Sequence, residues 1–149
     1  RLEELWPTLM ERCPEMKTLV INADNGPECS GQRTQWLKRM VDFSNTHDIT
    51  IQLAYYPPYH SKYNPIERCW GILENHWRGE LLNSVEKTLG LARSMTYNAI
   101  SPMVHLVEQV YQSGVTIAKK VMKEIEAQLS RKEGLEKWFI TISPQGKMG

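Results

Sequence analysis

The sequence predicts an α/β fold in which a helix joins two parallel strands. The first observation is a short apolar run at residues 19–21 that stops at a polar loop beginning with Asp24. The second is the helical spacing of apolar residues across residues 30–47, and the third is the alternation of apolar and polar residues across residues 48–56. A strand, helix and strand of these lengths form a right-handed crossover, so both strands should end at the same edge of one sheet.

The composition is typical of a soluble protein with one domain. The chain has 149 residues, 41% of them hydrophobic and 23% charged, and a mean hydropathy of −0.47. No run approaches the ~18 apolar residues of a membrane span, and no signal-peptide pattern opens the chain, so we expect a cytoplasmic location. Its three cysteines are odd in number and lack CxxC spacing, which argues against a disulfide framework and a structural zinc site. The net charge of +1 neither supports nor excludes a nucleic-acid partner.

The chain begins at Arg1 and runs into the first strand without a helix-start signal. We interpret residues 1–14 as the last turns of a helix, and the sequence as the C-terminal part of a longer protein. Asp24 closes the first strand. Ligands bind at this edge of an open α/β sheet, which makes Asp24 a candidate binding residue. An Asp that closes a strand also often caps the following turn, so both interpretations stay open.

The connecting helix and the second strand each have one apolar face. The strand at residues 48–56 contains β-branched residues at alternating positions. Arg33 lies on the outer or loop-proximal side of the helix, where charges are more often solvated than engaged with a ligand. The expected buried residues are Trp36, Leu37, Met40, Val41 and Phe43 or Ser44 in the helix, and Ile49, Ile51, Leu53 and Tyr55 in the strand.

A second carboxylate, Glu67, falls in the first turn of the next helix. Asn64 is a suitable N-cap, and Pro65 a suitable first residue because it has no amide proton to leave unpaired. The helix dipole would favour the ionised form of Glu67, as a metal ligand requires. A Glu at the third helical position is also the partner used by a capping box, and these residues alone do not decide between the two roles.

The same helix has two distinct faces. We expect an inner face of Ile66, Trp70, Leu73 and Trp77, and a second face of Glu67, Gly71, Glu74 and Arg78. Gly71, one turn after Glu67, leaves room for a bulky substrate or allows close packing of another element, two interpretations of equal weight.

Asp24 and Glu67 therefore converge on one edge of the predicted sheet. Mg²⁺ and Mn²⁺ prefer such oxygen ligands, and a pair of these ions can activate an attacking hydroxyl and stabilise the leaving oxygen in phosphoryl transfer. Sites of this kind normally use three carboxylates, whereas only two are well placed in this chain.

The remaining sequence predicts a helix, a strand, a helix and a strand. Ser84 should cap a helix through Tyr97, residues 104–111 alternate as in a strand, and residues 119–132 read as a charged helix. Residues 138–142 form the final strand. We expect the last two strands to pair as an antiparallel unit outside the main sheet.

Two stretches resemble a known family. They are Asp24-Asn25-Gly26 after a strand, and the block YPPYHSKYNPIERCW at residues 56–70. Both are similar to the DDE domain of bacterial insertion-sequence transposases, most of all to the ISAzo-type group, or Rhodopirellula-type transposase DDE domain. In that group a PP-x-x-SK-x-N-x-IE block carries the last catalytic acid. Residues 77–79, Leu82 and residues 138–144 also resemble the family, so the likeness covers most of the chain.

The resemblance implies a ribonuclease H-like fold with catalytic acids in the order Asp, Asp and Glu. Asp24 matches the second Asp and Glu67 the third acid, and the first Asp would lie upstream of Arg1. Asp48 is rejected as an alternative because it begins a strand, at the wrong edge of the sheet. The chain would then contain only the second half of the fold.

That half would comprise a strand-helix-strand-helix part of the catalytic domain in residues 1–100. Residues 101–149 would form a strand-helix-strand extension packed on it. The fragment alone is expected to be inactive.

In the full-length enzyme, the resemblance implies metal-dependent cleavage of DNA at transposon ends, followed by attack of the freed 3′-hydroxyl on target DNA. Asp24 and Glu67 would hold two Mg²⁺ or Mn²⁺ ions. The expected partners are DNA and a second copy on paired ends, with no membrane and no small-molecule substrate. One alternative is a catalytically inactive, DNA-binding remnant without the first Asp. Another is a different ribonuclease H-like nuclease or integrase, which would cleave without joining.

Five residues are candidates for DNA contact. Lys62 and Ser61 match the family block and would contact a phosphate beside the metals, although a solvated loop lysine is an equal alternative. Arg33 and Arg78 fit phosphate positioning, which supplies affinity but little sequence information. His60 is the least specific of the five because a lone loop histidine is more often simply exposed.

Overall fold

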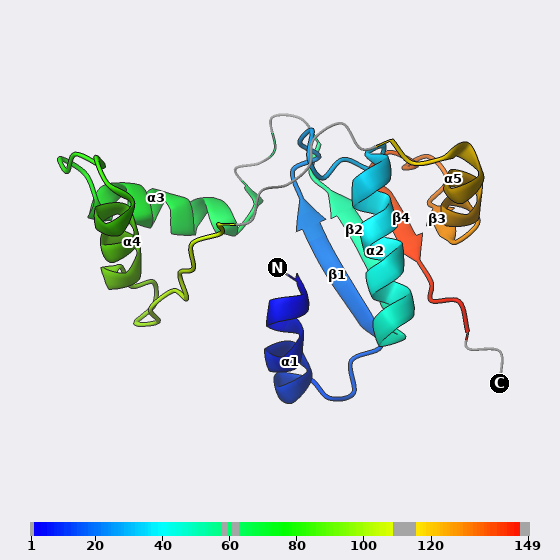
Figure 1. The fold of residues 1–149 in the computed structure, drawn as a ribbon, viewed down its shortest axis with the longest axis horizontal. Helices are drawn as coiled ribbons and strands as arrows, with labels where there is room; N and C mark the ends of the chain where they lie inside the picture. The colour runs from blue at the N-terminus through cyan, green and yellow to red at the C-terminus, as the bar shows by residue number, and fades with distance from the viewer. Residues whose placement is uncertain (1, 58–59, 61–62, 109–115, 147–149) are drawn as a thin grey trace. The chain divides into compact units, whose positions relative to one another are not determined.

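The computed structural model describes residues 2–57, 60, 63–108 and 116–146. The chain forms two compact units, shown in Figure 1. Unit 1 comprises Arg1–Tyr59 and Gly114–Gly149, and unit 2 comprises His60–Ser113. The elements of unit 1 are α1 (Leu2–Arg12), β1 (Thr18–Ala23), α2 (Thr34–His47), β2 (Thr50–Tyr55), α5 (Lys119–Glu126), β3 (Leu129–Arg131) and β4 (Phe139–Ile142). Those of unit 2 are α3 (Ile66–His76) and α4 (Val85–Ser94).

The sheet of unit 1 has the strand order β1-β2-β4-β3. β1 and β2 are parallel, with a register that runs from Thr18 opposite Thr50 to Ala23 opposite Tyr55. This confirms the predicted crossover through α2, which begins at Thr34 rather than near residue 30. β4 pairs antiparallel with both β2 and β3. The mixed sheet and its helices are compatible with a ribonuclease H-like fold.

The core of unit 1 lies between one face of the sheet and the helices packed on it. Figure 1 shows α2 lying along the strands. Burying about eleven large apolar side chains against one another removes enough surface from water to stabilise a sheet of this size. The buried residues are Leu37, Met40, Val41, Phe43, Ile49, Ile51, Leu53, Tyr55, Ile125, Ile140 and Ile142. The predicted faces of α2 and β2 are therefore confirmed, with Trp36 only partly buried.

The turn between α2 and β2 is fixed by the backbone and one buried hydroxyl. Ser44 is fully buried, and its Oγ donates a hydrogen bond to the Ile49 carbonyl over 2.7 Å. Asp48 is the C-cap of α2 in the left-handed region, with φ 51°, and its N–H donates to the Ser44 carbonyl. Asp48 thus precedes β2, at the opposite end of the parallel strand pair from Asp24.

The prediction for the C-terminal part was wrong in three respects. The charged helix ends at Glu126, and Leu129–Arg131 form β3. Residues 104–108, the described part of the predicted strand at 104–111, are not a strand. β4 joins the main sheet beside β2 instead of forming a separate pair. The physical reason is that the backbone N–H and C=O groups of a strand need hydrogen-bond partners on a neighbouring strand. Leu129–Arg131 find these partners on β4. No described strand pairs with residues 104–108.

Unit 2 consists of two helices with little buried between them. Ser84 caps α4 as predicted, accepting a hydrogen bond from the Lys87 N–H over 3.1 Å, but the helix ends at Ser94 and not at Tyr97. Leu73 and Met95 are its buried apolar residues. Ile66 and Trp70, expected on the inner face of α3, are 42% and 55% exposed. Two short helices cover only a narrow stripe of each other, so most of that expected face is not buried.

Among the described residues, no helix combines the length and apolarity needed to cross a membrane.

Candidate active site

Asp24 lies directly after β1, at the carboxyl edge of the parallel strand pair. Its side chain is exposed, and its Oδ1 accepts a hydrogen bond from the Gly26 N–H over 3.1 Å and one from the Cys29 thiol over 3.5 Å. The turn-capping role that the sequence allowed is therefore present. It uses one carboxylate oxygen, and Oδ2 has no polar partner in the described part of the chain. Capping the turn and binding a cation are thus compatible roles for Asp24.

The loop after Asp24 is held against the ends of β2 and β4. Asn25 adopts a left-handed conformation with φ 61°, and its Oδ1 accepts a hydrogen bond from the Gly31 N–H over 3.3 Å. Gly31 is buried, and a Cβ there would lie 2.8 Å from Ile140 Cδ1 and 3.3 Å from Tyr55 Cε2. The loop reaches its packed position only because residue 31 has no side chain.

Two further polar groups near this loop were missed by the sequence prediction. Burial raises the pKa of Cys29, as do its hydrogen bond to Asp24 and the charge of that carboxylate, so the thiol is the form that donates to Oδ1. Burial also raises the pKa of Tyr55 to about 12, and its hydroxyl accepts a hydrogen bond from Trp36 Nε1 over 3.0 Å. The sequence contained a signal for the contact between Trp36 and Tyr55, because a tyrosine on the inward face of a strand requires a hydrogen-bond partner for its hydroxyl.

Glu67 lies in the first turn of α3 and is exposed. The helix begins at Ile66, one residue later than predicted, and Asn64 Oδ1 still accepts a hydrogen bond from the Ile66 N–H over 3.4 Å. The Glu67 N–H donates to the Asn64 carbonyl over 3.0 Å. The contacts of the described residues include no capping-box bond from the Glu67 carboxylate to the backbone. Glu67 is therefore an exposed acid near the positive end of the helix.

Gly71, one turn after Glu67, lies in open space. A Cβ built at Gly71 would meet no described atom within 4 Å. Within unit 2, no described atom therefore packs closely against this glycine.

The two carboxylates belong to different compact units, Asp24 to unit 1 and Glu67 to unit 2. Each is exposed in its own surroundings and offers at least one oxygen without a polar partner among the described residues. Such hard oxygen donors fit Mg²⁺ or Mn²⁺. No group of three potential metal ligands occurs among the residues that the structure describes. The donor set fits the predicted metals in kind.

Comparison with known families decides the broader identity. The family model described as the Rhodopirellula transposase DDE domain matches residues 1–144. This chain belongs to that transposase family. The match confirms the resemblance seen in residues 24–26 and 56–70, and the family implies transposase function with DNA as partner. No curated protein and no solved structure gave a match.

The predicted DNA-contact residues of this transposase domain lie in varied surroundings. Arg33 pairs with Glu28 over 3.8 Å, and both side chains are well exposed. His60 stacks on Tyr63 with ring centroids 5.8 Å apart, and Arg78 is exposed just after α3. Ser61 and Lys62 lie outside the described residues.

Proposed function

We propose that Asp24 and Glu67 are the metal-binding carboxylates of this transposase domain. The reaction is cleavage of DNA at transposon ends, followed by attack of the freed 3′-hydroxyl on target DNA. The observation that carries the proposal is the position of Asp24 at the carboxyl edge of β1, within a chain that matches a DDE domain from residue 1 to residue 144. Glu67 is the acid within residues 56–70, the block that resembles the family, and the same match covers it.

The two acids have separate tasks in this proposal. Asp24 uses Oδ1 to fix its own turn, which leaves Oδ2 oriented for a cation. Glu67 stands at the start of α3, where the positive end of the helix dipole favours a charged carboxylate. Two bound Mg²⁺ or Mn²⁺ ions would supply stabilisation of the attacking and leaving oxygens of an in-line displacement. In this proposal DNA lies against the face of α3 that Gly71 shares with Glu67, where a Cβ at Gly71 would meet no described atom within 4 Å.

We further propose that the remaining acid comes from a strand paired along the free edge of β1. Within the described residues β1 pairs only with β2, so its other edge carries unpaired backbone groups. A longer chain that supplies this strand would complete the three-acid site.

A second candidate function is DNA binding without turnover. The specific observation in its favour is that the described residues contain no group of three metal ligands. In both candidates, Arg33, Arg78 and His60 are exposed groups suited to phosphate contact, together with Ser61 and Lys62 of the family-like block. We also propose that the transposase binds paired transposon ends as a homodimer and that it acts in the cytoplasm.

The test is strand transfer by the full-length transposase carrying Glu67→Gln or Asp24→Asn. Each substitution removes a metal ligand while keeping the size of the side chain. We expect a loss of at least about 100-fold, beyond the 10–100-fold typical of groups that only support a ligand. Matched controls are Glu74→Gln on the same helix and Asp48→Asn before β2, both exposed, which should retain activity.

The outcomes separate the candidates. Intact strand transfer in Glu67→Gln would show that the site is wrongly assigned. Cleavage without joining in the wild type would favour a nuclease, and DNA affinity without metal-dependent turnover would favour the binding-only candidate.

A further inference from the structure

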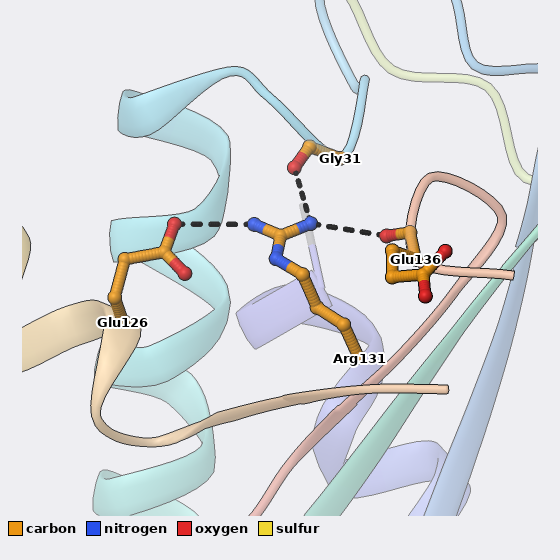
Figure 2. Close-up of polar contacts among 4 residues, drawn as sticks. All are labelled: Gly31, Glu126, Arg131 and Glu136. Atoms are coloured by element: carbon orange, nitrogen blue, oxygen red, sulfur yellow. Dashed lines mark hydrogen bonds and ion pairs between the residues drawn. The ribbon is translucent and has the colours of Figure 1, made fainter. Parts of the chain in front are cut away.

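Arg131, at the end of β3, binds the loop that follows Asp24 although it lies far away in the sequence. Its Nη1 donates to the Gly31 carbonyl over 3.0 Å and to the Glu136 carbonyl over 3.3 Å. Its Nη2 donates to Glu126 Oε1 over 3.1 Å. Figure 2 shows the guanidinium between these three acceptors, which come from the loop, the β3–β4 turn and the end of α5.

These contacts continue to Asp24 through a short series of hydrogen bonds. The Gly31 N–H donates to Asn25 Oδ1, and Asn25 is the left-handed residue next to Asp24. The Gly26 N–H then donates to Asp24 Oδ1. Arg131 thus holds the far end of the loop, and the loop holds the carboxylate.

The geometry requires an arginine at this position. The planar guanidinium can address several acceptors at once in a fixed fork, whereas a lysine ammonium is a compact point charge on a flexible stem. The Arg131 side chain is 25% exposed, so its contacts are partly shielded from water and stronger than those of a fully solvated pair. Replacing Arg131 by an uncharged residue would remove this charged donor from the Gly31 carbonyl.

We propose that Arg131 is a positioning residue for the Asp24 carboxylate, so that the affinity of this carboxylate for a divalent cation depends on the hydrogen bond that Arg131 donates to Gly31. The inference rests on the proposed metal-binding role of Asp24 and extends it to a residue on a different strand. Arg131 itself does not touch the metal or the DNA in this proposal. A purely structural role would affect folding stability and leave metal affinity unchanged.

The test is a Mn²⁺ titration of the full-length transposase followed by the amide NMR signals of Gly26, Cys29 and Gly31, which the paramagnetic ion broadens when it binds nearby. We expect broadening in the wild type that Asp24→Asn abolishes. Arg131→Gln should weaken the apparent affinity about tenfold, as for other residues that orient a metal ligand. The matched control is Lys38→Gln, which breaks an ion pair with Asp42 on α2 without touching the loop and should leave the affinity unchanged.

The variant Arg131→Lys separates the effect of the guanidinium geometry from the effect of the positive charge. It also replaces Arg131→Gln in this test if that variant does not fold. It keeps the positive charge but cannot reproduce the fork, so we expect an affinity several-fold below the wild type. Wild-type affinity in Arg131→Lys, or in a folded Arg131→Gln, would overturn the positioning role while leaving the metal site intact. Absence of any Asp24-dependent broadening in the wild type would instead overturn the proposed metal site, and with it the inference.

Discussion

The two acids of the proposed site are held in very different ways. Asp24 belongs to a loop fixed by hydrogen bonds from Gly26 and Cys29 and by the contact of Arg131 with Gly31. Glu67 is oriented only by the start of its own helix, and its carboxylate has no polar partner among the described residues. In the proposed site, unit 1 would therefore hold Asp24 in place before a cation binds, whereas no comparable network of described contacts holds Glu67 in unit 2. Pre-organisation of ligands is what makes a metal site precise.

The units differ in the same way in their cores. Unit 1 buries side chains from two helices and a sheet, and Leu53, Ile51 and Ile140 are fully buried there. Unit 2 buries mainly Leu73 and Met95, while Trp70 and several other large apolar side chains remain exposed. Stability should therefore be concentrated in unit 1.

The largest expected effect tests this contrast. Leu53→Ala leaves a cavity at the centre of the sheet, and we expect a loss of about 3–5 kcal/mol in the free energy of unfolding. Leu73→Ala in unit 2 should cost about 2 kcal/mol or less because the helix pair can close around the missing atoms. Urea-induced unfolding followed by circular dichroism measures both. Equal losses would show that the two cores are equally well packed.

The next effect concerns pH and Tyr55. The pKa of Tyr55 in the folded protein is about 12, raised by burial above its ordinary value of 10. The raised pKa means that the folded state keeps the phenol proton longer than the unfolded state. The contribution of Tyr55 to the free energy of unfolding is present in full below pH 10 and is lost as the pH rises from 10 to 12. The loss is about 1.4 kcal/mol per pH unit and roughly 2–3 kcal/mol in total.

Unfolding measured between pH 9 and 12 checks this contribution. Tyr55→Phe should remove that part of the slope, at a cost of about 1 kcal/mol at neutral pH for the lost hydrogen bond from Trp36. An unchanged slope in Tyr55→Phe would assign the alkaline loss to other groups.

How much could be predicted from the sequence differs between the units for a physical reason. In unit 1, alternation in residues 48–56 and helical spacing in α2 predicted the buried faces because a sheet and a helix bury one side each. In unit 2 the same reasoning on α3 failed for Ile66 and Trp70, because periodicity shows which face is apolar and not what covers it. β3 was missed because three residues carry too little pattern to compete with a helical reading of residues 119–132.

The site followed the same rule. The position of Asp24 directly after β1 was predicted from the point where an apolar run ends, a local signal, whereas its metal-binding role stays a prediction. Arg131 was not found, because its link to Gly31 spans 100 positions in the sequence, and no local pattern encodes such a contact.

The smallest effects come from two glycines that the structure places in opposite surroundings. Gly31→Ala would press a methyl group against Ile140 at 2.8 Å, so we expect a loss of about 1–3 kcal/mol. Gly71→Ala adds a methyl group in open space within α3, and we expect a gain of about 0.5–1 kcal/mol from its better helix propensity. Thermal unfolding of both variants gives the sign directly.

The two glycines also bear on the proposed site in opposite directions. Gly31→Ala should shift the loop that holds Asp24 and so weaken Mn²⁺ binding as well as stability. Gly71→Ala should raise stability yet reduce strand transfer in the full-length transposase, if the free space beside Glu67 is there for DNA. A Gly71→Ala variant that is both more stable and fully active would show that this space has no functional use, and Glu67 would lose its supporting observation on α3.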